Sequence, residues 1–263
     1  MRILLTNDDG ITAPGIQALH AALDGLGEVI TVAPATVQSA MSHKITFHHP
    51  LMTREIQVNP SMRGIEVEGS PADCVKIALR AIWPERYGPG ARPDVVISGM
   101  NSGANVGINV IYSGTVAAAV ESAFLGVPAI AVSLHLGRPQ APHYGRAAEL
   151  ARIAIDRVLE HAIDPHSVIN INVPRTERAD APMPPIRVAP MNTAAGIDGY
   201  ERRTGPGGQV YYWPTGNGME FVRTDTGSDV ELLTERSVTI TPLRYDLTDH
   251  ARMTTWRERL ERR

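Results

Sequence analysis

The chain has 263 residues, of which 43% are hydrophobic and 20% charged, values typical of an ordinary globular protein. This length is sufficient for one large α/β domain, or for a domain with an appendage. The formal net charge of −3 gives no electrostatic footprint for polymeric nucleic acid or for an anionic membrane. The single cysteine, Cys74, excludes an internal disulfide and a cysteine-cluster metal site.

Hydrophobic residues form no run that approaches the roughly 20 residues of a membrane span. The N-terminus, where Arg2 precedes a very short apolar run that ends in acids, does not match a signal peptide. We therefore expect a soluble, cytoplasmic protein with no membrane partner.

Strand-like and helix-like segments alternate over the first two thirds of the chain, which is the pattern of a parallel sheet covered by helices. The predicted strands are short apolar runs that cover residues 2–6, 29–33, 94–97, 129–134 and 167–173, with looser extended segments over 51–68. Helix start signals or helical periodicity follow these strands near Pro14, Ser70, Thr115 and residue 143. The sequence therefore predicts the α/β class.

The composition changes beyond about residue 178, where prolines and glycines become frequent. Two extended stretches, 209–214 and 219–223, are separated by Thr215-Gly216-Asn217-Gly218, which predicts a β-hairpin. The closing segment RMTTWRERLERR predicts a short basic helix. Because this region is too poor in apolar residues to fold alone, we predict a core over 1–190 and a C-terminal hairpin and helix arm over 191–263 that supports oligomerisation.

Two adjacent carboxylates, Asp8 and Asp9, follow the first predicted strand and precede Gly10. Neighbouring carboxylates repel, and burying both without a cation is costly or keeps one of them protonated. A divalent cation removes this cost. Asp-Asp-Gly is also typical of a turn or of a helix cap, so this motif taken alone leaves both interpretations open.

Other strand ends add further oxygen atoms. Ser39 lies in the polar loop 35–49 after the second strand, and the strand 94–97 is followed by Ser98, Asn101, Ser102 and Asn105. Open parallel sheets bind ligands at the carboxyl ends of their strands, so we expect these side chains near the two aspartates. Carboxylate, hydroxyl and amide oxygens suit Mg²⁺, Mn²⁺ or Ca²⁺ and suit zinc poorly.

The run SGMNSGANVGINVIYSGT, residues 98–115, is rich in glycine and asparagine. Glycines let backbone amides approach an anion, and a helix that begins at Thr115 directs its N-terminal amides toward it, so the run is a possible phosphate cradle. Such runs also occur for purely conformational reasons. The sequence lacks a Walker loop, GxGxxG, HExxH and GxSxG, which leaves zinc-protease and serine-hydrolase interpretations without support.

Two further groups of side chains remain open to interpretation. His43 and Lys44 lie near Ser39 and could contact a phosphate, although solvated loop residues explain them equally well. Three consecutive aromatic residues, Tyr211, Tyr212 and Trp213, could stack on a base or pack across an interface.

The chain resembles the SurE family, the stationary-phase survival proteins. The matching segments extend over almost the whole chain in family order: ILLTNDDG at Ile3–Gly10, Ser39, GSPADCV at Gly69–Val75, SGMNSGANVG at Ser98–Gly107, YSGTVAAAVE at Tyr112–Glu121 and VTITPL at Val238–Leu243. The resemblance implies a metal-dependent 5′/3′-nucleotidase that acts on nucleoside monophosphates. It also implies a Rossmann-like core and a C-terminal arm shared between the subunits of a homodimer or homotetramer.

The resemblance further implies one divalent metal ion per subunit (Mg, Mn or Ca), held by Asp8, Asp9, Ser39 and Asn101. With the glycine-rich run, it implies that the phosphate is bound by Asn101, Ser102, Gly103, Asn105, Ser113, Gly114 and Thr115. One departure concerns the segment ATVQSA, residues 35–40, which lacks the arginine that the family usually carries there. Substrate affinity and base preference therefore stay open.

We expect phosphomonoester hydrolysis with Asp8 and Asp9 as catalytic residues, and Asp9 is the better candidate for acting on the nucleophile. An exopolyphosphatase or another metal-dependent phosphomonoesterase is the alternative within the enzymes. A non-catalytic nucleotide or metal sensor is the alternative in a different class, and it would bind a nucleoside monophosphate without releasing phosphate.

Overall fold

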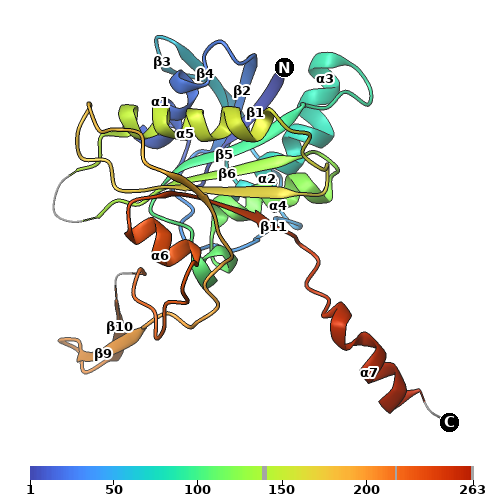
Figure 1. Cartoon of the computed structure of the whole chain (residues 1–263). Helices are drawn as coiled ribbons and strands as arrows, with labels where there is room; N and C mark the ends of the chain where they lie inside the picture. Colours follow the sequence, from blue (N-terminus) through green and yellow to red (C-terminus); the bar gives the residue numbers. More distant parts are fainter. Residues whose placement is uncertain (138–140, 217, 262–263) are drawn as a thin grey trace.

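The computed structural model describes residues 1–137, 141–216 and 218–261. Within these residues a nine-stranded sheet has the order β3-β4-β2-β1-β5-β6-β7-β11-β8 (Figure 1). Its strands are β1 (Arg2–Thr6), β2 (Glu28–Pro34), β3 (Thr53–Asn59), β4 (Met62–Val67), β5 (Val95–Ser102), β6 (Ala129–Leu134), β7 (Val168–Val173), β8 (Ile186–Val188) and β11 (Val238–Leu243). The strands from β4 to β7 are mutually parallel, whereas β3 and β11 pair antiparallel with β4 and β7. The predicted α/β class with a mostly parallel sheet is confirmed.

Helices cover both faces of the sheet because its central strands, such as β1 and β6, bury apolar side chains on both sides. On one face lie α1 (Pro14–Ala22) and α5 (Tyr144–Leu159), which pack on Ile3, Leu5 and Ile97. The other face is covered by α2 (Pro71–Ile77), a π-helical turn (Ala78–Ile82), α3 (Trp83–Tyr87) and α4 (Gly114–Phe124). In the part of the chain that the structure describes, no helix combines the length and the apolar character that crossing a membrane requires.

The strand order reverses at β1. The chain first extends the sheet through β2 and β4, and it then returns to place β5 on the other side of β1. In open α/β sheets this reversal opens a crevice at the carboxyl ends of the two strands. The turn after β1 and the end of β5 therefore meet where a ligand is expected.

The strand β5 is longer than the predicted 94–97. After a register irregularity between Ser98 and Asn101 it pairs again with β6, where Asn101 and Ser102 lie opposite Ser133 and Leu134. Part of the predicted glycine-rich loop is therefore held by sheet hydrogen bonds.

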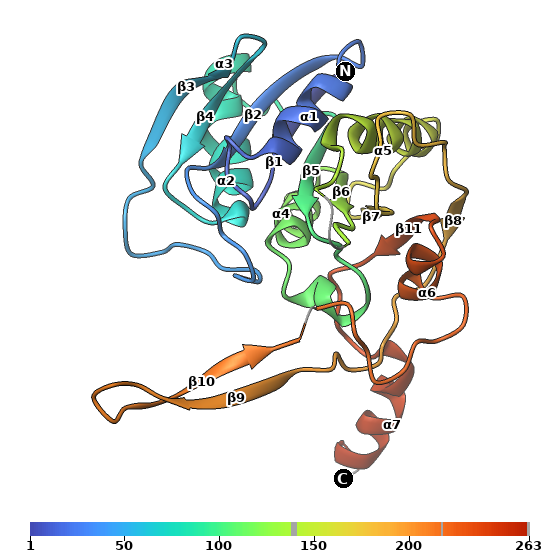
Figure 2. The ribbon, with the colours of Figure 1, turned by 90° about the vertical axis from the view of Figure 1, so that its left-hand side faces the viewer.

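The C-terminal region contributes to the core and also extends beyond it. β11 lies between β7 and β8 in the main sheet, and α6 (Asp229–Thr234) buries Val230 and Leu233 against Val106 and Phe221. The hairpin of β9 (Gly199–Thr204) and β10 (Val210–Thr215) and the helix α7 (His250–Leu260) extend away from the sheet (Figures 1 and 2). The predicted division at 190/191 stays a prediction, to which the structure adds that β11 belongs to the core sheet.

The basic helix predicted near the C-terminus is confirmed as α7. The position predicted for the hairpin was wrong. The stretch 209–214 forms β10, but it pairs with β9, which precedes it, and Phe221 makes only an isolated bridge to Gly196. The turn is Gly205-Pro206-Gly207-Gly208, closed by a 2.8 Å hydrogen bond from Gly205 N to Gln209 O. Asn217 of the predicted turn lies outside the described residues.

Candidate metal and phosphate site

A tight turn places Asp8 and Asp9 at the carboxyl end of β1. The Asn7 side-chain amide donates to Gly10 O at 2.8 Å, and Gly10 has a φ of +95°, a left-handed conformation that favours glycine. The loop after β2 passes Gly10 at van der Waals distance, since a Cβ atom built there would lie 3.4 Å from the backbone of Thr36. The turn thus holds both acids between β2 and β5.

The Asp8 carboxylate is held by the first turn of α4. Asp8 is 4% exposed and accepts hydrogen bonds from Thr115 N at 3.0 Å and from Thr115 Oγ1 at 2.5 Å. A Cβ atom at Gly114 would lie 2.9 Å from Asp8 Cβ and Oδ2, so this close approach requires glycine. Burial, with a smaller contribution from the charge of Asp9, raises the pKa of Asp8 to about 6, although the Thr115 hydrogen bonds favour the charged form.

The Asp9 carboxylate is only partly buried and contacts the end of β5. It accepts a hydrogen bond from Ser102 N at 2.7 Å, and Ser102 Oγ lies 2.9 Å from the Tyr144 hydroxyl. The neighbouring Asn101 donates from Nδ2 to Gly103 O at 2.7 Å, which leaves its Oδ1 as the remaining polar atom of that side chain. Asn101, Ser102 and Gly103 therefore lie beside Asp9.

Ser39 lies in the irregular segment 35–49 and is exposed. The preceding residue, Gln38, donates its backbone N–H to Asp8 O at 2.7 Å, so the segment runs along the aspartate turn. The structure thereby brings all three predicted strand-end loops to the same edge of the sheet. The metal and phosphate roles assigned to their residues stay predictions.

Asn105 lies in a buried hydrogen-bond network that holds the glycine-rich run against the sheet. Its side chain donates to Ser133 Oγ at 2.8 Å, and its backbone N–H donates to Asn172 Oδ1 at 2.8 Å. Asn170 and Asn172 each donate to Asn105 O, at 2.8 and 3.0 Å. This support was missed at the level of sequence, where two asparagines at alternate positions of the buried strand SVININV were the available signal.

The negative charge of the aspartate pair has no protein counter-charge among the described residues, where neither Asp8 nor Asp9 forms an ion pair. The same part of the chain holds no group of three or more His, Cys, Asp or Glu side chains suited to a metal. A cation at this edge would therefore combine two carboxylates with hydroxyl and amide oxygens, which is a donor set for a hard divalent ion.

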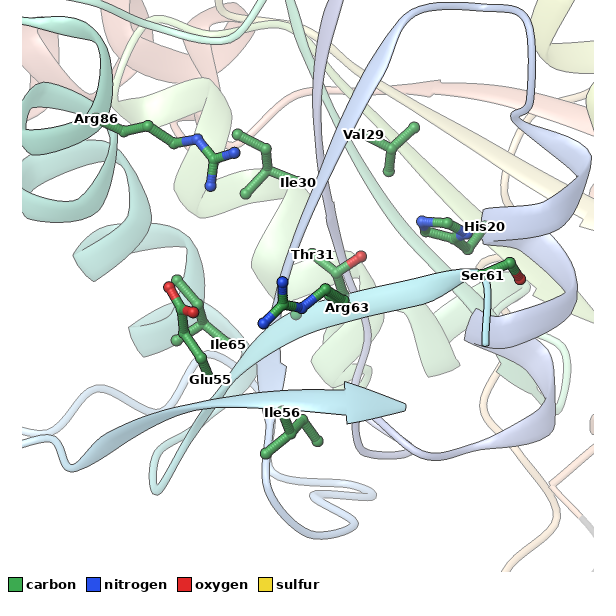
Figure 3. Close-up of a pocket in the computed structure, with 11 residues that line it drawn as sticks. His20, Val29, Ile30, Thr31, Glu55, Ile56, Ser61, Arg63, Ile65 and Arg86 are labelled. Carbon is green, nitrogen blue, oxygen red and sulfur yellow. The ribbon is translucent and has the colours of Figure 1, made fainter. Parts of the chain in front are cut away.

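A separate cleft of about 310 Å³ opens at the other end of β2, where β2 and β4 diverge (Figure 3). Arg63 and Arg86 line it together with Glu55, His20 and apolar side chains, and Arg86 also lies 3.7 Å from Glu28. None of the predicted site residues lines this cleft, so the chemistry of the aspartate edge, rather than a cavity, defines the candidate site.

The fold and this edge together define a class: α/β proteins with an acidic, oxygen-rich ligand site at the strand-order reversal of a parallel sheet. The family model described as Survival protein SurE matches residues 3–195, and the chain belongs to the SurE family. It is 44% identical to "5′-nucleotidase SurE" of Rhodopirellula baltica, with 94% of each chain covered. It is 43% identical to the protein of that name from Nitratidesulfovibrio vulgaris, over 96% of this chain and 90% of the relative.

A solved structure extends the likeness to three dimensions. The crystal structure of SurE from Aquifex aeolicus matches with a TM-score of 0.80 at 33% identity, and the match covers 98% of this chain and 99% of that one. The likeness therefore includes the C-terminal region as well as the sheet.

Proposed function

We propose that this chain is a divalent-metal-dependent 5′/3′-nucleotidase that hydrolyses nucleoside monophosphates to nucleoside and phosphate. The observation that carries the proposal is the pair Asp8 and Asp9, which meets the ends of β2 and β5 and the start of α4 and forms no ion pair with any residue that the structure describes. The names of the relatives, 5′-nucleotidase SurE, support the activity and the substrate class.

The residues that would hold the metal are Asp8, Asp9, Ser39 and Asn101, with one Mg²⁺, Mn²⁺ or Ca²⁺ per subunit. Two negative charges and two neutral oxygens fit such an ion, and the raised pKa of Asp8 reflects burial that a bound cation would offset. When bound, the ion supplies Lewis-acid polarisation of a phosphoryl oxygen.

The phosphate would lie between the 101–103 segment and the start of α4. Ser113 accepts a hydrogen bond from Val116 N at 3.1 Å and so caps the helix, whose N-terminal dipole favours an anion beside Ser113 and Gly114. For Thr115 and Asn105, which were predicted to bind the phosphate, we propose a supporting role, because Thr115 hydrogen-bonds to Asp8 and Asn105 hydrogen-bonds to Ser133.

The two acids would divide the work according to their surroundings. Asp8 accepts two hydrogen bonds from Thr115, which fix its carboxylate. Asp9 is partly exposed, and within the described residues its Oδ2 accepts one hydrogen bond, from Ser102 N. Asp9 is therefore placed to orient an attacking water and accept its proton, and Asp8 to fix the geometry of the site.

The C-terminal arm would join subunits into a homodimer or homotetramer. Aromatic side chains on the hairpin and α7 are strongly exposed within one chain: Tyr200, Tyr212, Trp213 and Trp256 are 72%, 61%, 56% and 52% exposed. Exposed aromatic groups of this kind are typical of contact surfaces. A cytoplasmic location stays a prediction from the sequence.

Phosphate release from purified protein tests the proposal. The protein is stripped with a chelator and supplied with Mg²⁺, Mn²⁺ or Ca²⁺, and nucleoside 5′- and 3′-monophosphates are compared with short polyphosphate. We expect metal-dependent release from the nucleotides. Activity that survives chelation contradicts the metal role, and release from polyphosphate alone assigns the site to an exopolyphosphatase. Binding without release assigns a sensor.

A further inference from the structure

The segment that carries Ser39 has a backbone that its own residues do not favour. Ala40 and Ser42 have φ values of +55° and +52°, in the left-handed region that non-glycine residues seldom adopt. This conformation is less stable for such residues than ordinary backbone, because the Cβ atom comes too close to the following carbonyl oxygen. The turn around Ser39 must therefore be held by contacts with the rest of the chain.

These contacts flank Ser39 on its C-terminal side. Ser42 donates from its backbone N–H to Tyr112 O at 3.0 Å and from Oγ to Ile111 O at 2.9 Å. Thr46 donates from N and Oγ1 to the two carboxylate oxygens of Asp73, at 2.9 and 2.8 Å. Asp73 belongs to the GSPADCV segment, so this segment helps to hold the segment 35–49 in place.

A further contact joins the segment to α4 through a hydrogen bond. His43 Nε2 lies 2.9 Å from Oε2 of Glu121, whose side chain is only 4% exposed. The His43 ring also stacks on Phe124, with ring centroids 5.2 Å apart and planes 11° apart. The other carboxylate oxygen of Glu121 lies 3.6 Å from Lys76 Nζ.

One helix therefore contacts two parts of the candidate site. The first turn of α4 holds Asp8 through Thr115, and a later turn holds His43 through Glu121. Because both contacts belong to the same rigid element, the distance between the Asp8 carboxylate and the Ser39 loop is set by α4.

We propose that His43 is a positioning residue, which through its hydrogen bond with buried Glu121 fixes the loop that presents Ser39 to the metal. The inference rests on the proposed function, because it takes Ser39 as a ligand. Residues that orient metal ligands commonly change metal affinity when they are replaced, and His43 would do so from four positions away in the chain.

The structure makes the test practicable. Removing the His43 ring leaves Glu121 with Lys76 as its partner, so the buried carboxylate keeps a counter-charge and the variant is expected to fold. His43→Gln keeps an N–H donor near the position of Nε2. His48→Ala is the matched control, because His48 is an exposed histidine of the same segment.

Mn²⁺ binding to chelator-stripped protein, followed by electron paramagnetic resonance of free Mn²⁺, supplies the readout. We expect His43→Ala to weaken binding about tenfold, a typical effect for a group that orients a ligand. We expect His43→Gln to recover most of this loss and His48→Ala to match the unaltered protein. Phosphate release at saturating Mn²⁺ should change much less than the affinity.

A double-mutant cycle with Ser39→Ala separates positioning from general damage. If His43 acts through Ser39, His43→Ala has little further effect on Mn²⁺ affinity once Ser39 is alanine. An equal loss in both backgrounds, or no loss in either, overturns the inference. The proposed function fails differently, because the unaltered protein would then neither bind Mn²⁺ at this site nor release phosphate.

Discussion

The aspartate edge of the sheet and the protruding C-terminal elements differ in how far one chain completes them. At the edge, buried polar groups such as Asp8 and Asn105 find hydrogen-bond partners on other strands and helices of the same chain. On the hairpin β9–β10 and on α7, large apolar side chains stay in solvent. The comparison shows that residues of one chain hold Asp8 and Asn105 in place, whereas the large apolar side chains of the arm have no such cover within the described residues.

The strongest test of the aspartate edge is to replace one of its two acids. In the proposed mechanism, Asp9→Asn removes the charge of one metal ligand and the carboxylate that accepts the proton of water, so phosphate release should fall about 10³-fold, or roughly 4 kcal/mol. Release is measured at saturating Mn²⁺, with circular dichroism as the check of folding. The control is Asp180→Asn, at an exposed acid, and retention of a tenth of the activity would assign the chemistry elsewhere.

A methyl group beside the carboxylate should act almost as strongly. Gly114→Ala places a Cβ atom 2.9 Å from Asp8 Oδ2 and must displace it. Since small displacements of reacting groups cost about 10²-fold, we expect a loss of that order in kcat. Gly145→Ala is the matched control, because Gly145 lies in the first turn of α5 with its nearest neighbour atom at 3.8 Å. Equal activities of the two variants would contradict the close contact.

A substitution in α6 tests which part of the C-terminal region belongs to the core. Asp229 is fully buried and accepts hydrogen bonds from Gly107 N at 2.9 Å and Asn192 N at 2.8 Å. Asp229→Ala leaves two amides without these partners, so the free energy of unfolding should fall by about 2 kcal/mol in urea titrations. Asp198→Ala, at an exposed acid, should leave it unchanged, and an equally small effect at Asp229 would separate α6 from the core.

The arm should respond in the opposite way. Trp213→Ser and Trp256→Ser remove exposed rings, so the unfolding free energy of the protomer should change by less than about 0.5 kcal/mol. If the predicted oligomer buries these rings, its dissociation constant should rise about tenfold, because tryptophans are frequent anchors of interfaces. Sedimentation velocity over a dilution series measures the dissociation. Met52→Ser is the control, because Met52 is an exposed apolar residue outside the arm. Unchanged assembly would show that these rings are not contacts.

The smallest expected effect is a change in the pH dependence of stability. Burial in α1 lowers the pKa of His20 below 6.5, with partial compensation by Asp24. Below about pH 6.5 the unfolded chain therefore binds more protons at this position than the folded chain does. The free energy of unfolding decreases as the pH falls. His20→Gln should lessen the loss between pH 7.5 and 5.5 in urea titrations, whereas the exposed control His161→Gln should not. Parallel curves for all three proteins would contradict the assignment.

Sequence patterns predicted the sheet well where strands are short, apolar and bounded by turn residues. They failed where pairing depends on distant partners. The continuation of β5 past Ser98 depends on β6, and the partner of β10 is the segment before it because Gly205–Gly208 forms the turn. The turn signal at residues 215–218 is as strong as the one at residues 205–208. Only the folded chain shows which of them closes the hairpin.

The same limit applies to the site. Asp8, Asp9 and the glycine-rich run could be identified from residue types and their places after predicted strands. The hydrogen bonds between Asp8 and Thr115 join residues 107 positions apart, and His43 and Glu121 are 78 apart. Such contacts follow from the packing of α4 against the sheet, which no local pattern specifies.

The place of β11 has a consequence for the order in which the molecule can be completed during synthesis. Among the described strands β8 pairs with β11 alone, and β7 presents an open edge until β11 is made. An open edge invites pairing with other chains, and β7 is the strand whose Asn170 and Asn172 hold the glycine-rich run. A nascent chain that stops before residue 238 therefore leaves β7 as an exposed edge, so the synthesis of β11 protects the strand that supports the glycine-rich run.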